Sequence, residues 1–150
     1  MRTKVDNMLV YPWTPILDHD FTTDPYLESK NIEHSFESGR FNTDLEIMIG
    51  TTADEGIFFI HGYVTGRKKW EDLRNNIDTE GASQFFNIAN EAELTSDVKE
   101  KIRQIVNHYT GSTDNIDADH LQGIIDMYTG CSFSEALSNL IPYLTKKIKS

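Results

Sequence analysis

The sequence predicts an α/β fold, with one or few strands followed mostly by helices, and two observations support this prediction. The apolar run at residues 45–49, LEIMI, ends at Gly50, and a strand covered on both faces needs no alternation of apolar and polar residues. After a polar turn, Asp54 and Glu55 precede a second apolar run at residues 57–60, and acidic residues suit the start of a helix. A carboxylate on a loop leaving a strand lies where open α/β sheets bind their ligands.

The segments on either side of this stretch are less regular. Residues 1–44 are expected to be mostly irregular, because their prolines exclude a long helix. Short helices are predicted at Trp70–Asn76 and at Gly81–Asn90, the second of which should bury Phe85, Phe86 and Ile88.

The clearest predicted helix covers Ser96–Tyr109. Ser96 is a residue type that suits the N-cap position. The apolar residues of this segment recur at spacings of three and four and define one face: Val98, Ile102, Ile105, Val106 and Tyr109.

Two further helices are predicted towards the C-terminus. One covers about Asp117–Tyr128 and ends at Gly130. The other begins at residues 132–135, which show the capping-box pattern, and Pro142 inside it should produce a kink. No repeat, linker or low-complexity segment interrupts this order, so residues 1–150 are expected to form one domain.

Composition narrows the function classes. A chain of 150 residues is long enough to bury one core. Its net charge of −10, from 24 acidic and 14 basic residues, disfavours binding to nucleic acid or to anionic membranes. The single cysteine, Cys131, excludes an internal disulfide and a cysteine zinc site. Neither a signal peptide nor a transmembrane run is visible, so a soluble chain of unassigned compartment is expected.

Three motifs give the chain a family resemblance. Residues 45–62 resemble the segment that carries the acidic triad member in the type B carboxylesterase and cholinesterase family, where IG, a turn, DEG and an aromatic-rich helix follow one another. Residues 15–21, PILDHDF, resemble the family's P-V-(V/I)-D-G-D-F segment, although His19 stands where the family usually has Gly. Residues 37–42, ESGRFN, resemble its SGxFN motif. The region around residues 130–133 resembles the family more loosely.

The resemblance implies that residues 1–150 are a partial α/β-hydrolase domain in which Glu55 is the catalytic acid. In that role a carboxylate accepts the imidazole N–H of histidine and stabilises the imidazolium formed during acyl transfer. The family hydrolyses carboxylic esters through an acyl-serine, without a cofactor or a metal. The alternative for Glu55 is a carboxylate that only caps the helix after it.

The rest of the catalytic machinery is missing from the sequence. No G-x-S-x-G elbow and no HGGG-type oxyanion motif occur, and the nearest approaches, at Gly81 and Gly130, both follow the acid instead of preceding it. None of the five histidines has the glycine-rich context of the family's catalytic histidine: His19, His34, His61, His108 and His120. We therefore expect the chain to lack the nucleophile elbow and the catalytic histidine segment, and to be inactive alone.

Metal binding is not expected either. Asp18 and Asp20 are spaced as in some metal loops, but the glycine and the terminal glutamate of an EF-hand are missing. The oxygen-rich residues 114–120 are interpreted as a solvated turn.

Three hypotheses for function follow. The chain is a fragment of an ester hydrolase whose complete parent acts on a small carboxylic ester. Alternatively it is a non-catalytic, neuroligin-type module for protein binding or adhesion, or a self-contained helical protein. The family is often secreted or located in the lumen of the endoplasmic reticulum, and the sequence leaves the oligomeric state open.

Overall fold

The computed structural model describes residues 46–86, 88 and 90–147, together with Thr23, Glu37, Ser38, Asn42 and Asp44. The chain divides into two compact units, one of Ile49–Asn139 and one of Met1–Met48 with Leu140–Ser150. The predictions for residues 15–21, for most of residues 37–42 and for His19 and His34 fall outside the described residues. The candidate sites lie in the Ile49–Asn139 unit.

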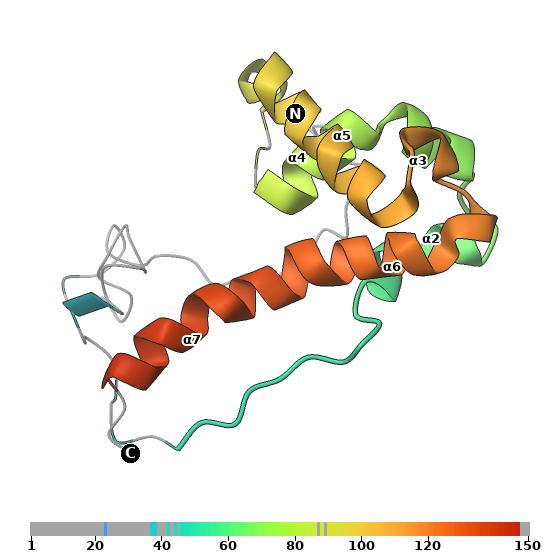
Figure 1. Cartoon of the computed structure of the whole chain (residues 1–150). Helices are drawn as coiled ribbons and strands as arrows, with labels where there is room; N and C mark the ends of the chain where they lie inside the picture. Colours follow the sequence, from blue (N-terminus) through green and yellow to red (C-terminus); the bar gives the residue numbers. More distant parts are fainter. Residues whose placement is uncertain are drawn as a thin grey trace. The chain divides into compact units, whose positions relative to one another are not determined.

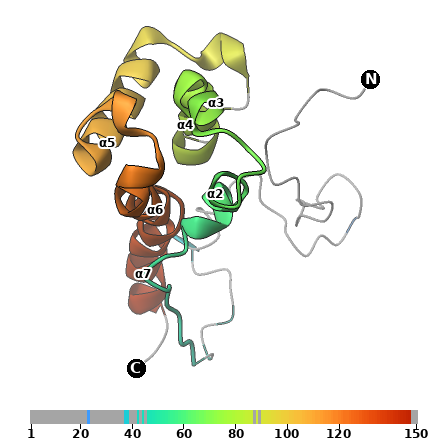
Figure 2. The ribbon, with the colours of Figure 1, turned by 90° about the vertical axis from the view of Figure 1, so that its right-hand side faces the viewer.

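Helices joined by short turns make up this unit (Figures 1 and 2). The α-helices are α2 (Ile57–Val64), α3 (Trp70–Asn75), α4 (Ile77–Phe86), α5 (Ser96–Thr110) and α6 (Leu121–Thr129). Short 3-10 turns are η1 (Glu91–Glu93), η2 (Thr113–Asn115) and η3 (Ala118–His120), and a π-helix, η4 (Gly130–Ser134), leads into α7 (Glu135–Lys147). Helix α5 packs against both α4 and α6, and α2 packs against α6.

The predicted α/β fold is wrong. Within the described ranges the regular structure is helical, without a strand or a sheet, and residues 46–50 are extended chain with no strand pairing. Ile47 and Ile49 are each 46% exposed and Met48 is fully exposed, so the apolar run does not enter the core. An isolated extended segment has no neighbour for its backbone N–H and C=O groups, and therefore does not form a strand by itself.

The prediction for α5 is confirmed. Its Ile102 and Val106 are fully buried, and Val98, Ile105 and Tyr109 pack against the core from partly buried positions. The N-cap is Thr95, one residue before the predicted Ser96, and its hydroxyl accepts the Val98 N–H at 3.3 Å. The helix ends at Gly111, whose φ of 81° is one that glycine adopts without a steric cost.

Helix α3 matches its prediction closely, whereas α4 begins and ends about four residues earlier than predicted. Asp78 and Glu80 lie in its first turn, where negative charge favours helix formation. After this helix, the Ile88 N–H donates a hydrogen bond to the Ala82 carbonyl at 3.0 Å.

Helix α6 ends at Thr129 with Gly130 as its C-cap, as predicted, but Gly130 does not end the helical backbone. Gly130 has helical angles, φ −60° and ψ −56°, and the chain continues through η4 directly into α7. The capping box predicted at residues 132–135 therefore does not start a separate helix. Pro142 lies inside α7, as predicted.

The core lies where α2, α3, α4, α5 and α6 meet. Its fully buried side chains are Ile60, Leu73, Ile102, Val106, Ile116, Ile124 and Met127. Aromatic pairs surround it: Tyr63 stacks on Trp70 with ring centroids 5.4 Å apart, and Phe59 stacks on Tyr128 at 5.5 Å. Helix α6 is thus buried over much of its length by the rest of the unit, and the turn that carries Glu55 packs against it.

Candidate functional site

The turn at residues 53–56 carries the predicted catalytic acid and leads into α2. Glu55 is half-buried, and one of its carboxylate oxygens accepts the Thr52 N–H at 3.1 Å. The N-cap position of α2 belongs to Gly56, without a side-chain cap, so Glu55 does not cap this helix. Glu55 lies directly before the N-terminus of α2, but its side chain makes no cap hydrogen bond to the helix among the described residues.

Helix α6 holds the residues on both sides of Glu55. The Gly56 N–H donates to Thr129 Oγ1 at 2.8 Å in a buried hydrogen bond, and the Thr129 hydroxyl donates in turn to the Ile125 carbonyl at 2.8 Å. On the other side, Gln122 Nε2 donates to Asp54 Oδ1 at 3.0 Å. Two anchors on one helix thus fix the backbone of the turn while the Glu55 carboxylate stays at its surface.

Close contact explains why this position is glycine. A Cβ atom on Gly56 would lie 2.8 Å from Thr129 N and 2.9 Å from Tyr128 Cβ, and would also overlap the Ile125 carbonyl oxygen. Only glycine lets the turn approach α6 so closely. Sequence reasoning identified the Asp-Glu-Gly motif but could not identify Thr129 and Gln122, because nothing local links them to residues 54–56.

The structure does not bring a histidine to Glu55 among the described residues. His61 is exposed on α2, and His108 lies on α5. His120 Nδ1 lies 2.8 Å from Asp117 Oδ1, and the hydrogen bond to His120 lowers the pKa of the Asp117 carboxyl. Asp117 also accepts the backbone N–H groups of Asp119 and His120, so this pair caps the η3 turn.

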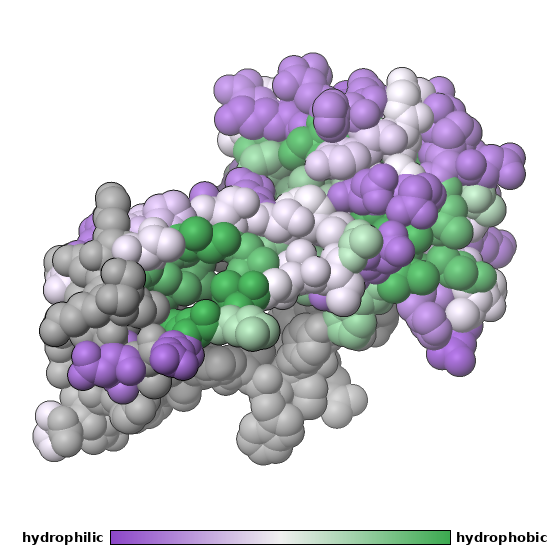
Figure 3. Space-filling model, turned by 60° about the horizontal axis from the view of Figure 1, so that its bottom comes forward, coloured by the Kyte–Doolittle hydropathy of each residue, from purple (hydrophilic) through white to green (hydrophobic). Residues whose placement is uncertain are grey.

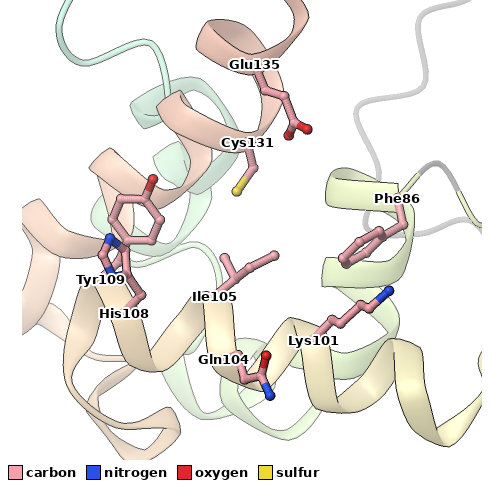
Figure 4. A pocket seen from close by; sticks show the side chains of 8 residues that line it. All are labelled: Phe86, Lys101, Gln104, Ile105, His108, Tyr109, Cys131 and Glu135. Carbon is pink, nitrogen blue, oxygen red and sulfur yellow. The ribbon is translucent and has the colours of Figure 1, made fainter.

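A groove about 480 Å³ in volume lies beside α5 (Figure 4). Its lining residues come from α4, α5, η4 and the start of α7: Phe86, Lys101, Gln104, Ile105, His108, Tyr109, Cys131 and Glu135. The Cys131 sulfur and the Ile105 side chain point into the space between the helices, as Figure 4 shows. The sequence signal for this groove is the second face of α5, where residues 101, 104, 105 and 108 follow helical spacing.

The groove offers no activated nucleophile. Burial, reinforced by Glu135, raises the pKa of the Cys131 thiol from 9.0 to about 11, so the thiol stays protonated near neutral pH. Burial also raises the pKa of the Tyr109 hydroxyl. The groove therefore has the chemistry of an apolar surface with polar edges.

The nearest sequence approach to a nucleophile elbow, residues 130–134, is the π-helix η4. An elbow requires a sharp strand-to-helix turn that exposes the serine, whereas here the backbone is continuous helix and Ser132 Oγ is buried without a hydrogen-bond partner in the described part of the chain.

No cluster of three or more histidine, cysteine or acidic side chains suited to a metal occurs in the described part of the chain. None of its helices there has the length and apolar character of a transmembrane span. No protein-family model, no curated protein and no solved structure matches the chain.

Proposed function

We propose that the chain is part of a carboxylic ester hydrolase similar to the type B carboxylesterases, to which it contributes the catalytic acid Glu55. Three motifs in one order, at residues 15–21, 37–42 and 45–62, support this proposal. The serine and the histidine of the triad belong to residues outside these 150, and the chain alone hydrolyses no ester.

The observation that carries the proposal is a difference in hydrogen bonding among the three residues of the Asp54-Glu55-Gly56 turn. Asp54 and Gly56 both hydrogen-bond to α6, whereas the Glu55 carboxylate accepts only a local N–H, from Thr52, among the bonds of the described residues. A carboxylate on an anchored backbone, with acceptor capacity left over, suits a group that must orient an imidazole. A carboxylate with a purely structural role would be expected to use its oxygens in hydrogen bonds or ion pairs with the rest of the fold.

The chemistry assigned to Glu55 is orientation and charge stabilisation. Its carboxylate accepts the N–H of the histidine imidazole, which fixes the tautomer in which the other ring nitrogen can take the serine proton. When the imidazolium forms, the negative carboxylate stabilises it. Without the nucleophile and the base no covalent route exists, so Glu55 by itself cannot produce turnover.

The test uses the 150-residue chain and the complete protein that its gene encodes. The chain should neither hydrolyse a p-nitrophenyl ester nor react with a fluorophosphonate, whereas the complete protein should do both. In the complete protein, Glu55→Gln should lower kcat/KM by roughly 10³–10⁴-fold, because an amide cannot stabilise the imidazolium.

Asp54→Asn is the matched control, since it changes a carboxylate one residue away that bonds to Gln122. It should change kcat/KM by less than about tenfold. Equal losses for the two variants would show that the turn matters only for folding. Turnover by the chain alone, blocked by the fluorophosphonate, would contradict the proposal outright.

A second candidate function is a non-catalytic protein-binding module resembling the neuroligin type. The exposed apolar side chains of α2, Ile57, Phe58 and Val64, favour it, because such groups are typical of protein interfaces. The gene sequence on either side of these codons discriminates: an in-frame G-x-S-x-G before the chain and a later glycine-flanked histidine indicate an enzyme, and their absence indicates the binding module.

A further inference from the structure

The segment that leads into the turn before α2, residues 46–52, runs as extended chain without helical turns (Figure 1). Each of its residues is exposed, and its apolar side chains stand in solvent: Ile47 and Ile49 are each 46% exposed, and Met48 is fully exposed. Space is also open around Gly50, where a Cβ atom would meet no other atom within 4 Å. The segment therefore presents apolar side chains that the fold does not use for packing.

The backbone of this segment is open as well. No hydrogen bond in the described part of the chain involves the backbone of residues 46–51. An endoprotease binds its substrate as an extended strand, through hydrogen bonds to main-chain groups and through pockets for side chains. Residues 46–52 offer both features without any local unfolding, and exposed segments of this kind are the preferred sites of proteolytic cleavage.

The boundary between the two compact units falls inside this segment, between Met48 and Ile49. The chain also passes from one unit to the other after Asn139, but that crossing lies within helix α7, where the backbone is not extended. The buried apolar residues of the core all lie between Ile60 and Tyr128, on the C-terminal side of the first boundary. A cut at this boundary therefore removes no residue from the core.

We propose that residues 46–52 are a site of limited proteolysis, cleaved at the Met48–Ile49 bond by an endoprotease that accepts an aliphatic side chain. Water adds across this bond, so that the Met48 carbonyl carbon becomes a carboxylate and the Ile49 nitrogen becomes an ammonium group. The cut ends the covalent connection between residues 1–48 and the helical unit. The Glu55 turn keeps its hydrogen bonds to α6, because all of these residues follow the cut. The cleavage does not depend on the catalytic role proposed for Glu55.

Exposure of an apolar side chain does not by itself select this bond. Apolar surface also forms patches among hydrophilic residues on the face that Figure 3 displays. Ile57 offers the same side chain as Ile49 at nearly the same exposure, 45% against 46%, but it is the first residue of helix α2. A protease must unwind α2 and expose the buried Ile60 before it can bind the chain around Ile57, whereas the chain around Ile49 is already extended. Backbone conformation should therefore decide between the two bonds.

Thermolysin, which cleaves on the amino side of aliphatic residues, measures this preference. In a native digest of the full chain, mass spectrometry should show the Met48–Ile49 bond cut at least about a hundredfold faster than the Gly56–Ile57 bond. The helical circular dichroism should persist after the first cut. In urea that unfolds the chain, the rates for the two bonds should come within about tenfold of each other, because both are then equally accessible.

Two variants form a matched pair for this assay. Ile49→Asp removes the aliphatic side chain at the cleaved bond and should slow cleavage of that bond by about tenfold or more. Ile57→Asp changes an equally exposed isoleucine on α2 and should leave the rate at the Met48–Ile49 bond unchanged. Equal rates for the two bonds in the native digest would overturn the proposal. So would a hundredfold preference that persists in urea, since it would come from the local sequence and not from the fold.

Discussion

Gly56 is the residue at which two segments far apart in the sequence come into contact. Its N–H reaches Thr129 Oγ1, 73 positions later in the chain, and its missing side chain leaves room for the backbone of α6. Its φ of −59° is open to every residue type, so the requirement for glycine is steric and does not concern backbone conformation.

Gly56→Ala should therefore destabilise the fold by at least about 2 kcal/mol, because the added methyl group overlaps backbone atoms that cannot move independently. Urea unfolding followed by circular dichroism measures this loss. Gly50→Ala is the control: a Cβ there has no atom within 4 Å, and its free energy of unfolding should stay within about 0.5 kcal/mol of wild type. Equal effects at both positions would show that the close approach to α6 has no energetic weight.

Among the elements, α5 shows how far local sequence determines a helix. The spacing of its apolar residues predicted both its extent and its buried face, because helical periodicity is a property of the segment itself. The observed N-cap is Thr95, one residue before the predicted Ser96. Both are suitable residue types, and only the backbone angles decide between them. Thr95 has extended angles, φ −69° and ψ 164°, and its hydroxyl reaches Val98 N.

The pair of neighbouring residues gives a direct test of the cap. Thr95→Ala should lower the free energy of unfolding by about 1 kcal/mol, because the Val98 N–H loses its acceptor. Ser96→Ala, inside the first turn, should have little effect or stabilise slightly, since alanine has the higher helix propensity. Thermal or urea unfolding of the two variants decides the position, and a larger loss at Ser96 would assign the cap to that residue.

Other elements could not be predicted locally. The run at residues 45–49 has the composition of a buried strand, but whether it becomes one depends on neighbouring strands, which the local sequence does not reveal. Helix α6 ends next to the predicted Gly130, yet helical backbone continues through η4 into α7, because Gly130 keeps right-handed helical angles and does not adopt the left-handed conformation of a typical glycine C-cap. The Glu55 prediction came from a motif, whereas its anchors on α6 required the structure.

At the scale of the whole molecule, the buried side of α4 places a carboxyl group beside the aromatic core. Burial raises the pKa of Glu80, although Lys68 acts in the opposite direction. The pKa of Tyr63 is raised to about 12, first by burial and then by the negative charges of Glu80 and Asp72. Ionised Glu80 is thus less favourable in the folded chain than in water.

The stability of the molecule should therefore depend on pH through Glu80. The pKa of Glu80 is higher in the folded chain than in the unfolded chain. The stability that its protonated carboxyl contributes is therefore fully present below the pKa that Glu80 has in the unfolded chain, and it is lost as pH rises through the pKa of the folded state. Glu80→Gln should consequently be more stable than wild type at pH 7, and this advantage should disappear near pH 4.

Urea unfolding at the two pH values measures the difference. Glu71→Gln, at an exposed position on α3, is the control and should show no comparable change between pH 7 and pH 4. An advantage of Glu80→Gln that persists unchanged at pH 4 would mean that the carboxyl charge is not its cause.

The hydrogen bond between Gly56 and Thr129 also has a consequence for the order of folding. It closes a loop of 73 residues, and the entropic cost of closing such a loop is met only after the intervening segments have become compact. Helices such as α5, which are stabilised by near neighbours, can form earlier. The turn that carries Glu55 should therefore be among the last parts to acquire its final position, and among the first to lose it when α6 opens, so protection of the Gly56 amide from hydrogen exchange would report how long the candidate site persists.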